Sequence, residues 1–116
     1  GSEANDLAMR LARAATGRER TVVVDHAYHG HTVGALALSP YKFRHRSFDG
    51  KGQPSWITVC PAPDTYRGQY RGESAAREYA RFVEEACEAG DVGAFFIESG
   101  MSVAGVILPP EGYLQR

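Results

Sequence analysis

Apolar side chains recur every three or four positions in two long stretches of the chain. The first covers residues 3–15 and is followed by Gly17, and the second covers residues 74–89 and is followed by Gly90. This spacing gives a helix one apolar face, and a glycine just beyond the last turn is a common helix stop. We therefore predict two amphipathic helices here, and a shorter, weaker one over residues 32–38.

Three short apolar runs cover residues 21–25, 56–60 and 92–98. Their apolar residues are continuous instead of alternating, which is typical of strands buried on both faces. Strands that alternate with helices favour an α/β fold with a mostly parallel sheet and flanking helices. Two strong helices cannot cover both faces of such a sheet, so we expect exposed apolar sheet surface and interpret residues 1–116 as part of a larger domain. Residues 112–114 are expected to begin a further helix.

The overall balance of residues is that of an ordinary globular protein. The 116 residues include 13 basic and 14 acidic ones, and 43% are hydrophobic. The even charge favours neither nucleic acid nor a membrane as a partner, and no apolar run reaches the length of a membrane span. Cys60 and Cys87 lack metal-binding spacing, so we expect two reduced, buried thiols, as in a cytoplasmic protein.

The chain starts with Gly1-Ser2 directly before the first predicted helix. The first N–H groups of a helix have no intrahelical acceptor, glycine permits close approach of an anion, and a serine hydroxyl can donate a hydrogen bond. The pair is therefore a candidate phosphate cradle, which we interpret as native. The alternatives are a plain N-cap or the remnant of an expression tag.

Three histidines follow the first predicted strand, at positions 26, 29 and 31, beside Asp25. They raise the possibility of a zinc or nickel site, but their spacing matches no common zinc motif. We predict no metal site, and expect His26 and His31 to cap the strand end or to face solvent.

Two segments in this order, Gly1-Ser2-Glu3-Ala4-Asn5-Asp6 and Ala27-Tyr28-His29-Gly30-His31-Thr32, resemble the class-III aminotransferase family. These enzymes are built on pyridoxal 5′-phosphate (PLP), and the resemblance covers nearly the whole chain. Three further segments are similar to the alanine–glyoxylate aminotransferase 2-like group, which includes phospho-lyases that act on phosphoethanolamine. They are residues 39–44, 63–68 and 105–113.

The resemblance implies that residues 1–116 are a fragment of the PLP-binding large domain of a fold-type-I enzyme. Gly1 and Ser2 would then bind the cofactor phosphate, Tyr28 would stack on the cofactor ring, His29 would pack beside it, and Glu98 would line the pocket. No catalytic residue is predicted in the chain. Its lysines, Lys42 and Lys51, lie in nothing like the family's Schiff-base segment, which is expected after residue 116.

The resemblance also implies a homodimer that transfers the amino group of an amine or amino acid. Ser102-Val103-Ala104 stands where many members of the family have a second glutamate. This difference points away from the ornithine and GABA branches of the family. One alternative is a PLP-dependent phospho-lyase that eliminates phosphate from a phosphorylated amine such as phosphoethanolamine. Arg67 is the candidate that would bind the substrate phosphate, with Lys42, Arg44 and Arg71 as further cations. Another alternative is a non-enzymatic α/β module that binds a phosphorylated ligand.

Overall fold

The computed structural model describes residues 1–43 and 52–116. The helices predicted over residues 3–15, 32–38 and 74–89 and the three predicted strands are confirmed, with ends that differ by one or two residues. The elements are α1 (Ser2–Thr16), β1 (Arg20–Val24), α2 (Val33–Ala37), a 3-10 turn η1 (Pro40–Lys42), β2 (Ile57–Cys60), α3 (Ala75–Glu88) and β3 (Val92–Phe96). Gly17 ends α1 in the left-handed conformation, with φ 67°. The predicted cation Arg44 lies outside the described residues.

The three strands form one parallel sheet in the order β2-β1-β3. The central strand carries Val22, Val23 and Val24, whose side chains are fully buried. A continuous valine run is what a strand covered on both faces requires. This arrangement confirms the prediction of an α/β fold with a mostly parallel sheet.

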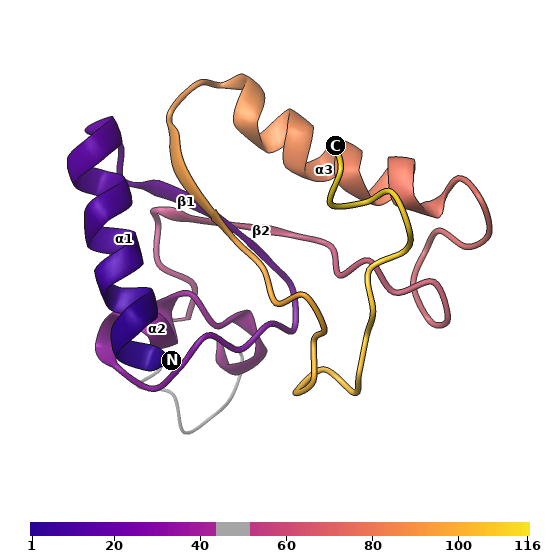
Figure 1. The fold of residues 1–116 in the computed structure, drawn as a ribbon, viewed down its shortest axis with the longest axis horizontal. Helices are drawn as coiled ribbons and strands as arrows, with labels where there is room; N and C mark the ends of the chain where they lie inside the picture. Colours follow the sequence, from indigo (N-terminus) through magenta and orange to yellow (C-terminus); the bar gives the residue numbers. More distant parts are fainter. Residues whose placement is uncertain (44–51) are drawn as a thin grey trace.

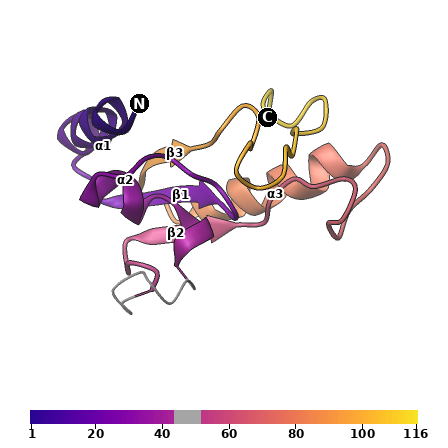
Figure 2. The ribbon, with the colours of Figure 1, turned by 90° about the horizontal axis from the view of Figure 1, so that it is seen from below.

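Helices pack on both faces of the sheet, and Figure 1 shows α1 and α3 on opposite sides of it. Val23 packs with Met9 of α1 and with Leu38, just after α2. On the opposite face, the Cys60 thiol contacts the Phe82 carbonyl of α3 at 3.4 Å. The C-terminal segment lies beside α3 in both views (Figures 1 and 2), where it joins a cluster of buried side chains. The described helices include none that is long and apolar enough to cross a membrane.

Three details of the sequence prediction are wrong. Strand β3 ends at Phe96, so Glu98 lies in the loop that follows the strand. Residues 112–114 form turns instead of a helix, because Gly112 has φ 87° and the Tyr113 N–H donates to the Pro110 carbonyl. Cys60 is buried as predicted, but Cys87 is exposed because the last turn of α3 borders an open apolar hollow.

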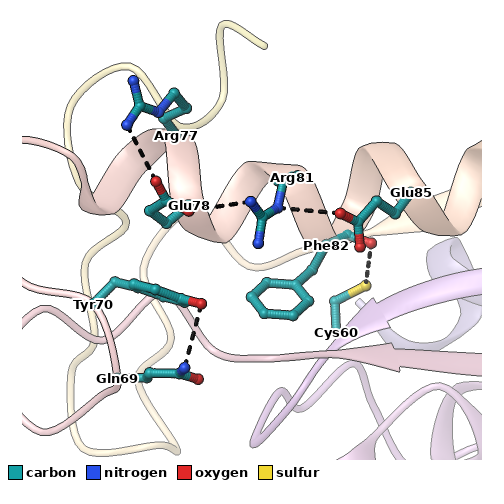
Figure 3. Close-up of polar contacts among 8 residues, drawn as sticks. All are labelled: Cys60, Gln69, Tyr70, Arg77, Glu78, Arg81, Phe82 and Glu85. Atoms are coloured by element: carbon teal, nitrogen blue, oxygen red, sulfur yellow. Dashed lines mark hydrogen bonds and ion pairs between the residues drawn. The ribbon is translucent and has the colours of Figure 1, made fainter.

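The outer face of α3 is polar, as an amphipathic helix requires (Figure 3). Arg81 lies between two glutamates, with its guanidinium 3.6 Å from Glu78 and 3.1 Å from Glu85. On the side toward the sheet, Cys60 lies below the same helix, and burial raises the pKa of its thiol to about 11. Part of the sheet stays uncovered, as expected, since Phe95 on the edge strand β3 is 38% exposed.

Candidate functional site

A cavity of about 630 Å³ lies where the carboxyl ends of β1 and β3 meet the first turn of α1. In parallel sheets, ligands bind at this edge. Three segments line the cavity: the start of α1, the loop after β1 and the loop after β3. The lining residues are Gly1, Ser2, Asn5, Tyr28, His29, Gly30, Phe96, Ile97, Glu98, Ser99 and Gly100.

The start of α1 and the loop after β1 are in close contact at Gly30. This glycine has φ 134°, and a Cβ atom there would lie 2.8 Å from the Ser2 Cα and closer still to the Ser2 hydroxyl. Two hydrogen bonds hold the contact. The His31 N–H donates to the Ser2 Oγ at 3.0 Å, and the Asn5 side-chain amide donates to the His29 carbonyl at 2.7 Å.

The first turn of α1 offers hydrogen-bond donors that an anion in the cavity could accept. Intrahelical bonding starts with the Asn5 N–H, which donates to the Gly1 carbonyl at 2.9 Å. The N–H groups before Asn5 therefore have no acceptor within the helix, and the helix dipole adds partial positive charge there. The Ser2 hydroxyl, which accepts from His31, still has its own hydrogen to donate.

Tyr28 is half-buried, and contacts from several elements fix its ring. Its N–H donates to the Glu98 Oε1 at 2.8 Å, so the loop after β3 holds its main chain. Its hydroxyl is 3.1 Å from the His31 Nδ1. The ring stands nearly perpendicular to those of His31 and Tyr41, at centroid distances of 5.1 and 5.4 Å. Such contacts set the plane of an aromatic ring.

His29 is the most buried titratable side chain of the cavity, at 7% exposure. Its N–H donates to the Ser39 Oγ at 2.9 Å, and its ring packs against Phe96. Burial lowers the pKa of His29, and the nearby Glu98 carboxylate offsets part of this effect. Within the described part of the chain, its buried Nε2 has no hydrogen-bond partner. The site thus holds a buried imidazole with one ring nitrogen unpaired among the described residues.

Arg67 lies apart from this cavity. Its side chain is exposed, with the guanidinium carbon 5.6 Å from the centre of the Tyr66 ring. The Asp64 carboxylate accepts hydrogen bonds from the N–H groups of Tyr66 and Arg67. The bond from the Arg67 N–H is the main cause of the lowered pKa of Asp64. Arg67 lines a second hollow of about 380 Å³ that also includes His26.

Five of the six predicted site residues therefore line one cavity, and Arg67 does not. Their roles in binding stay predictions. His26 and His31 are exposed, and His26 begins the loop with φ 62°. In residues 1–43 and 52–116, no three histidine, cysteine, aspartate or glutamate side chains lie close enough together to hold a metal ion.

The sequence analysis assigned no role to two residues that build this cavity. Asn5 holds the His29 carbonyl, and Ser39 accepts from the His29 N–H while its hydroxyl donates to the Ala35 carbonyl at 2.7 Å. Asn5 follows Ser2 by three positions, so its place on the same helix face was a usable signal. Ser39 carried no such signal, because a serine before a proline also marks a helix end.

Comparisons with known proteins identify the family of the chain. The sequence pattern of the family Aminotransferase class-III matches residues 1–116. The chain is 43% identical to "Alanine--glyoxylate aminotransferase 2-like" of Drosophila melanogaster, over 99% of this chain and 25% of the relative. It is 39% identical to "Ethanolamine-phosphate phospho-lyase homolog 1" of Caenorhabditis elegans, over 99% and 28%.

Among solved structures, a taurine:2-oxoglutarate aminotransferase from Bifidobacterium kashiwanohense, in complex with PLP and glutamate, superposes with a TM-score of 0.82. The match has 30% sequence identity and covers 99% of this chain and 27% of that one. The fold matches part of the fold-type-I fold of PLP-dependent transaminases. The chain belongs to the class-III aminotransferase family and spans about a quarter of the length of the curated relatives it matches.

Proposed function

We propose that residues 1–116 are the part of a PLP-dependent class-III transaminase that holds the phosphate of the cofactor and one side of its ring. The observation that carries this proposal is the cavity formed by α1 and the loops after β1 and β3. It combines a helix start, a glycine contact that a Cβ atom would fill, and an unpaired buried imidazole nitrogen. These residues fit PLP. When bound, PLP supplies an electron sink for the carbon that carries the substrate amine.

Each residue of the cavity has a distinct part in this proposal. Gly1 and Ser2 would bind the phosphate through main-chain N–H groups and the Ser2 hydroxyl. Tyr28 would stack on the ring, and Glu98 would keep Tyr28 in place by accepting its N–H at 2.8 Å. The buried His29 ring would pack beside the bound group and help to fix the loop after β1.

The whole protein is proposed to be a homodimeric, cytoplasmic enzyme that transfers the amino group of an amine or amino acid. In this proposal residues 1–116 are a fragment of the large domain, and the lysine that links to PLP lies outside them. Residues 1–116 alone are then inactive.

An absorbance spectrum of the purified whole protein tests the proposal. We expect a visible band from bound cofactor that sodium borohydride removes. A protein that shows no such band after addition of PLP would contradict the cofactor assignment. In that case the non-enzymatic α/β module becomes the better interpretation, and inorganic phosphate is the probe for it.

A phospho-lyase is the second candidate, because the relative from Caenorhabditis elegans that is 39% identical bears that name. Here Arg67, together with Arg71, would bind the substrate phosphate. The assay is phosphate release from phosphoethanolamine by the whole protein. For a phospho-lyase, Arg67→Ala should raise the KM for phosphoethanolamine about tenfold, the usual cost of a lost charged hydrogen bond.

A matched control is Arg77→Ala, since Arg77 is also exposed but lies on α3 with its guanidinium 3.2 Å from Glu78. It should leave this KM unchanged. Amino transfer without any phosphate release would leave the transaminase as the function of the protein.

A further inference from the structure

His31 connects two parts of the candidate cofactor site. Its main-chain N–H donates to the Ser2 Oγ at 3.0 Å, at the proposed phosphate end. Its ring Nδ1 is 3.1 Å from the Tyr28 hydroxyl, at the proposed ring end. The His31 side chain itself is exposed and does not line the cavity. It therefore touches the residues that would hold PLP without reaching the bound group.

We propose that His31 is a positioning residue that sets the angle of the Tyr28 ring before the cofactor binds. This inference rests on the proposed function, and it adds a residue that neither the family resemblance nor the cavity lining assigns.

The geometry around Tyr28 explains why a second anchor is needed. Glu98 holds only the main chain of Tyr28, so the side chain can still rotate about its own bonds. The Tyr41 ring packs edge-to-face against the Tyr28 ring, at an interplanar angle of 84°. The hydroxyl lies at the far end of the side chain, and a bond there removes the remaining rotation. His31 makes that bond and also packs at 82° to the ring.

The main chain fixes His31 in turn. Its N–H is tied to Ser2, and Gly30 before it can take φ 134° only because it has no side chain. The next residue, Thr32, caps α2 by accepting the Ala35 N–H at 3.2 Å. The His31 ring therefore stands on a rigid support. A ring held in its binding orientation loses less entropy when a ligand stacks on it, which strengthens binding.

The test uses the whole protein, freed of cofactor, and measures the apparent dissociation constant for PLP by absorbance titration. For His31→Ala we expect binding about five- to tenfold weaker, as for the loss of one hydrogen bond and its ordering effect. His31→Asn should bind nearly as well as the wild type, because its side-chain amide places a polar atom where Nδ1 was. His26→Ala is the matched control and should change nothing, since His26 is exposed and lies outside the cavity.

A double-mutant cycle identifies the bond as the cause. Tyr28→Phe keeps the aromatic ring and removes only the hydroxyl. If the bond to His31 carries the effect, Tyr28→Phe and His31→Ala each weaken PLP binding, and together they weaken it no further than either alone. The dissociation constant for inorganic phosphate should stay unchanged in His31→Ala, because the main-chain N–H that holds Ser2 remains.

Three results would overturn the proposal: PLP affinity in His31→Ala within twofold of the wild type, losses that add in the double variant, or no rescue by His31→Asn. A crystal structure of cofactor-free His31→Ala gives an independent readout, since the Tyr28 ring should then be rotated or present in several orientations. A wild-type protein that binds no PLP would overturn the proposed function as well. Normal wild-type binding with an unchanged variant would overturn only the role of His31.

Discussion

The cavity at the start of α1 and the loop that carries Arg67 are built in opposite ways. Three hydrogen bonds of the cavity join residues 24, 29 and 70 positions apart: Asn5 to His29, His31 to Ser2, and Tyr28 to Glu98. In the loop over residues 64–71, most bonds join residues two to four positions apart. Among the hydrogen bonds of the described residues in this loop, the longest in sequence joins the Tyr79 hydroxyl to the Asp64 carbonyl, 15 positions away.

This difference shows which contacts determine the conformation of each region. The cavity exists only when α1, β1 and β3 are already in place, so damage to one of its contacts changes the proposed cofactor site. The loop is held mainly by short-range hydrogen bonds, and Tyr70 anchors it to the buried cluster of α3 and Tyr113. Changes there should affect stability or the substrate without affecting the cofactor.

The largest expected effect comes from Gly30→Ala. The added methyl group would collide with Ser2, and φ 134° is a strained conformation for alanine. We expect the whole protein to lose about 2–4 kcal/mol of stability and to bind PLP more than tenfold more weakly. Thermal unfolding and PLP titration measure the two effects.

Gly90→Ala is the control for this substitution. Gly90 also has positive φ, at 72°, but a Cβ atom there would meet nothing within 4 Å. It should cost only about 1 kcal/mol and leave PLP binding unchanged. Equal losses in the two variants would show that the contact between Gly30 and Ser2 is unimportant.

Tyr79→Phe tests the other region. The buried Tyr79 hydroxyl donates to the Asp64 carbonyl at 3.0 Å and accepts the Tyr70 N–H at 3.2 Å. Its removal takes the hydrogen-bond acceptor from the Tyr70 N–H, which should lower stability by about 1–3 kcal/mol. The Asp64 carbonyl still accepts the Gly68 N–H at 2.9 Å. PLP affinity should not change. Tyr66→Phe is the control, because Tyr66 is 77% exposed and its loss should be within about 0.5 kcal/mol.

The stability of the cavity should depend on pH through His29. Burial lowers the pKa of His29 in the folded protein, so the unfolded chain takes up a proton first as the pH falls below about 6.5. Stability is therefore fully present above pH 6.5 and decreases toward lower pH, with a slope of at most about 1.4 kcal/mol per pH unit. Thermal midpoints between pH 7.5 and 5 measure this dependence.

His29→Gln should remove that part of the acid sensitivity, whereas His26→Gln should keep it because His26 is exposed. An identical pH profile in the wild type and His29→Gln would mean that His29 is protonated equally in both states.

The smallest effect is expected on the outer face of α3, outside both regions. Arg81 is 54% exposed and makes ion pairs with Glu78 and Glu85 (Figure 3). Exposed pairs of this kind contribute little, so Arg81→Ala should lower stability by about 0.5 kcal/mol or less and leave PLP binding intact. A loss above about 1 kcal/mol in thermal unfolding would contradict this expectation.

Most of the fold could be predicted from the sequence, because the patterns that mark helices and strands lie within short stretches of the chain. The period of apolar residues located α1 and α3, and the valine run at positions 22–24 located the central strand. Cys87 was predicted as buried and is exposed, because its environment depends on what covers the end of α3. Residues 112–114 have an apolar pattern, but the left-handed Gly112 directs the chain into turns.

Some residues of the candidate site could likewise be predicted from the sequence, and others could not. Gly1, Ser2, Tyr28, His29 and Glu98 were predicted through a family resemblance, and one cavity contains them all. The place of Asn5 on the helix face of Ser2 could have been predicted, but its contact with His29, like that of Ser39, depends on how separate segments meet in space. No local pattern of residues encodes such a meeting.

The parallel sheet also has a consequence for the synthesis of the protein. Val24 pairs with Cys60, 36 residues later, and Val23 pairs with Phe96, a further stretch down the chain. At about 5–20 residues per second, a ribosome needs roughly 2–7 s to make the first partner of the central strand. During that interval the three valines emerge with no strand to pair with, and such a segment is prone to aggregate. We therefore expect the nascent chain to depend on chaperones that bind short apolar segments.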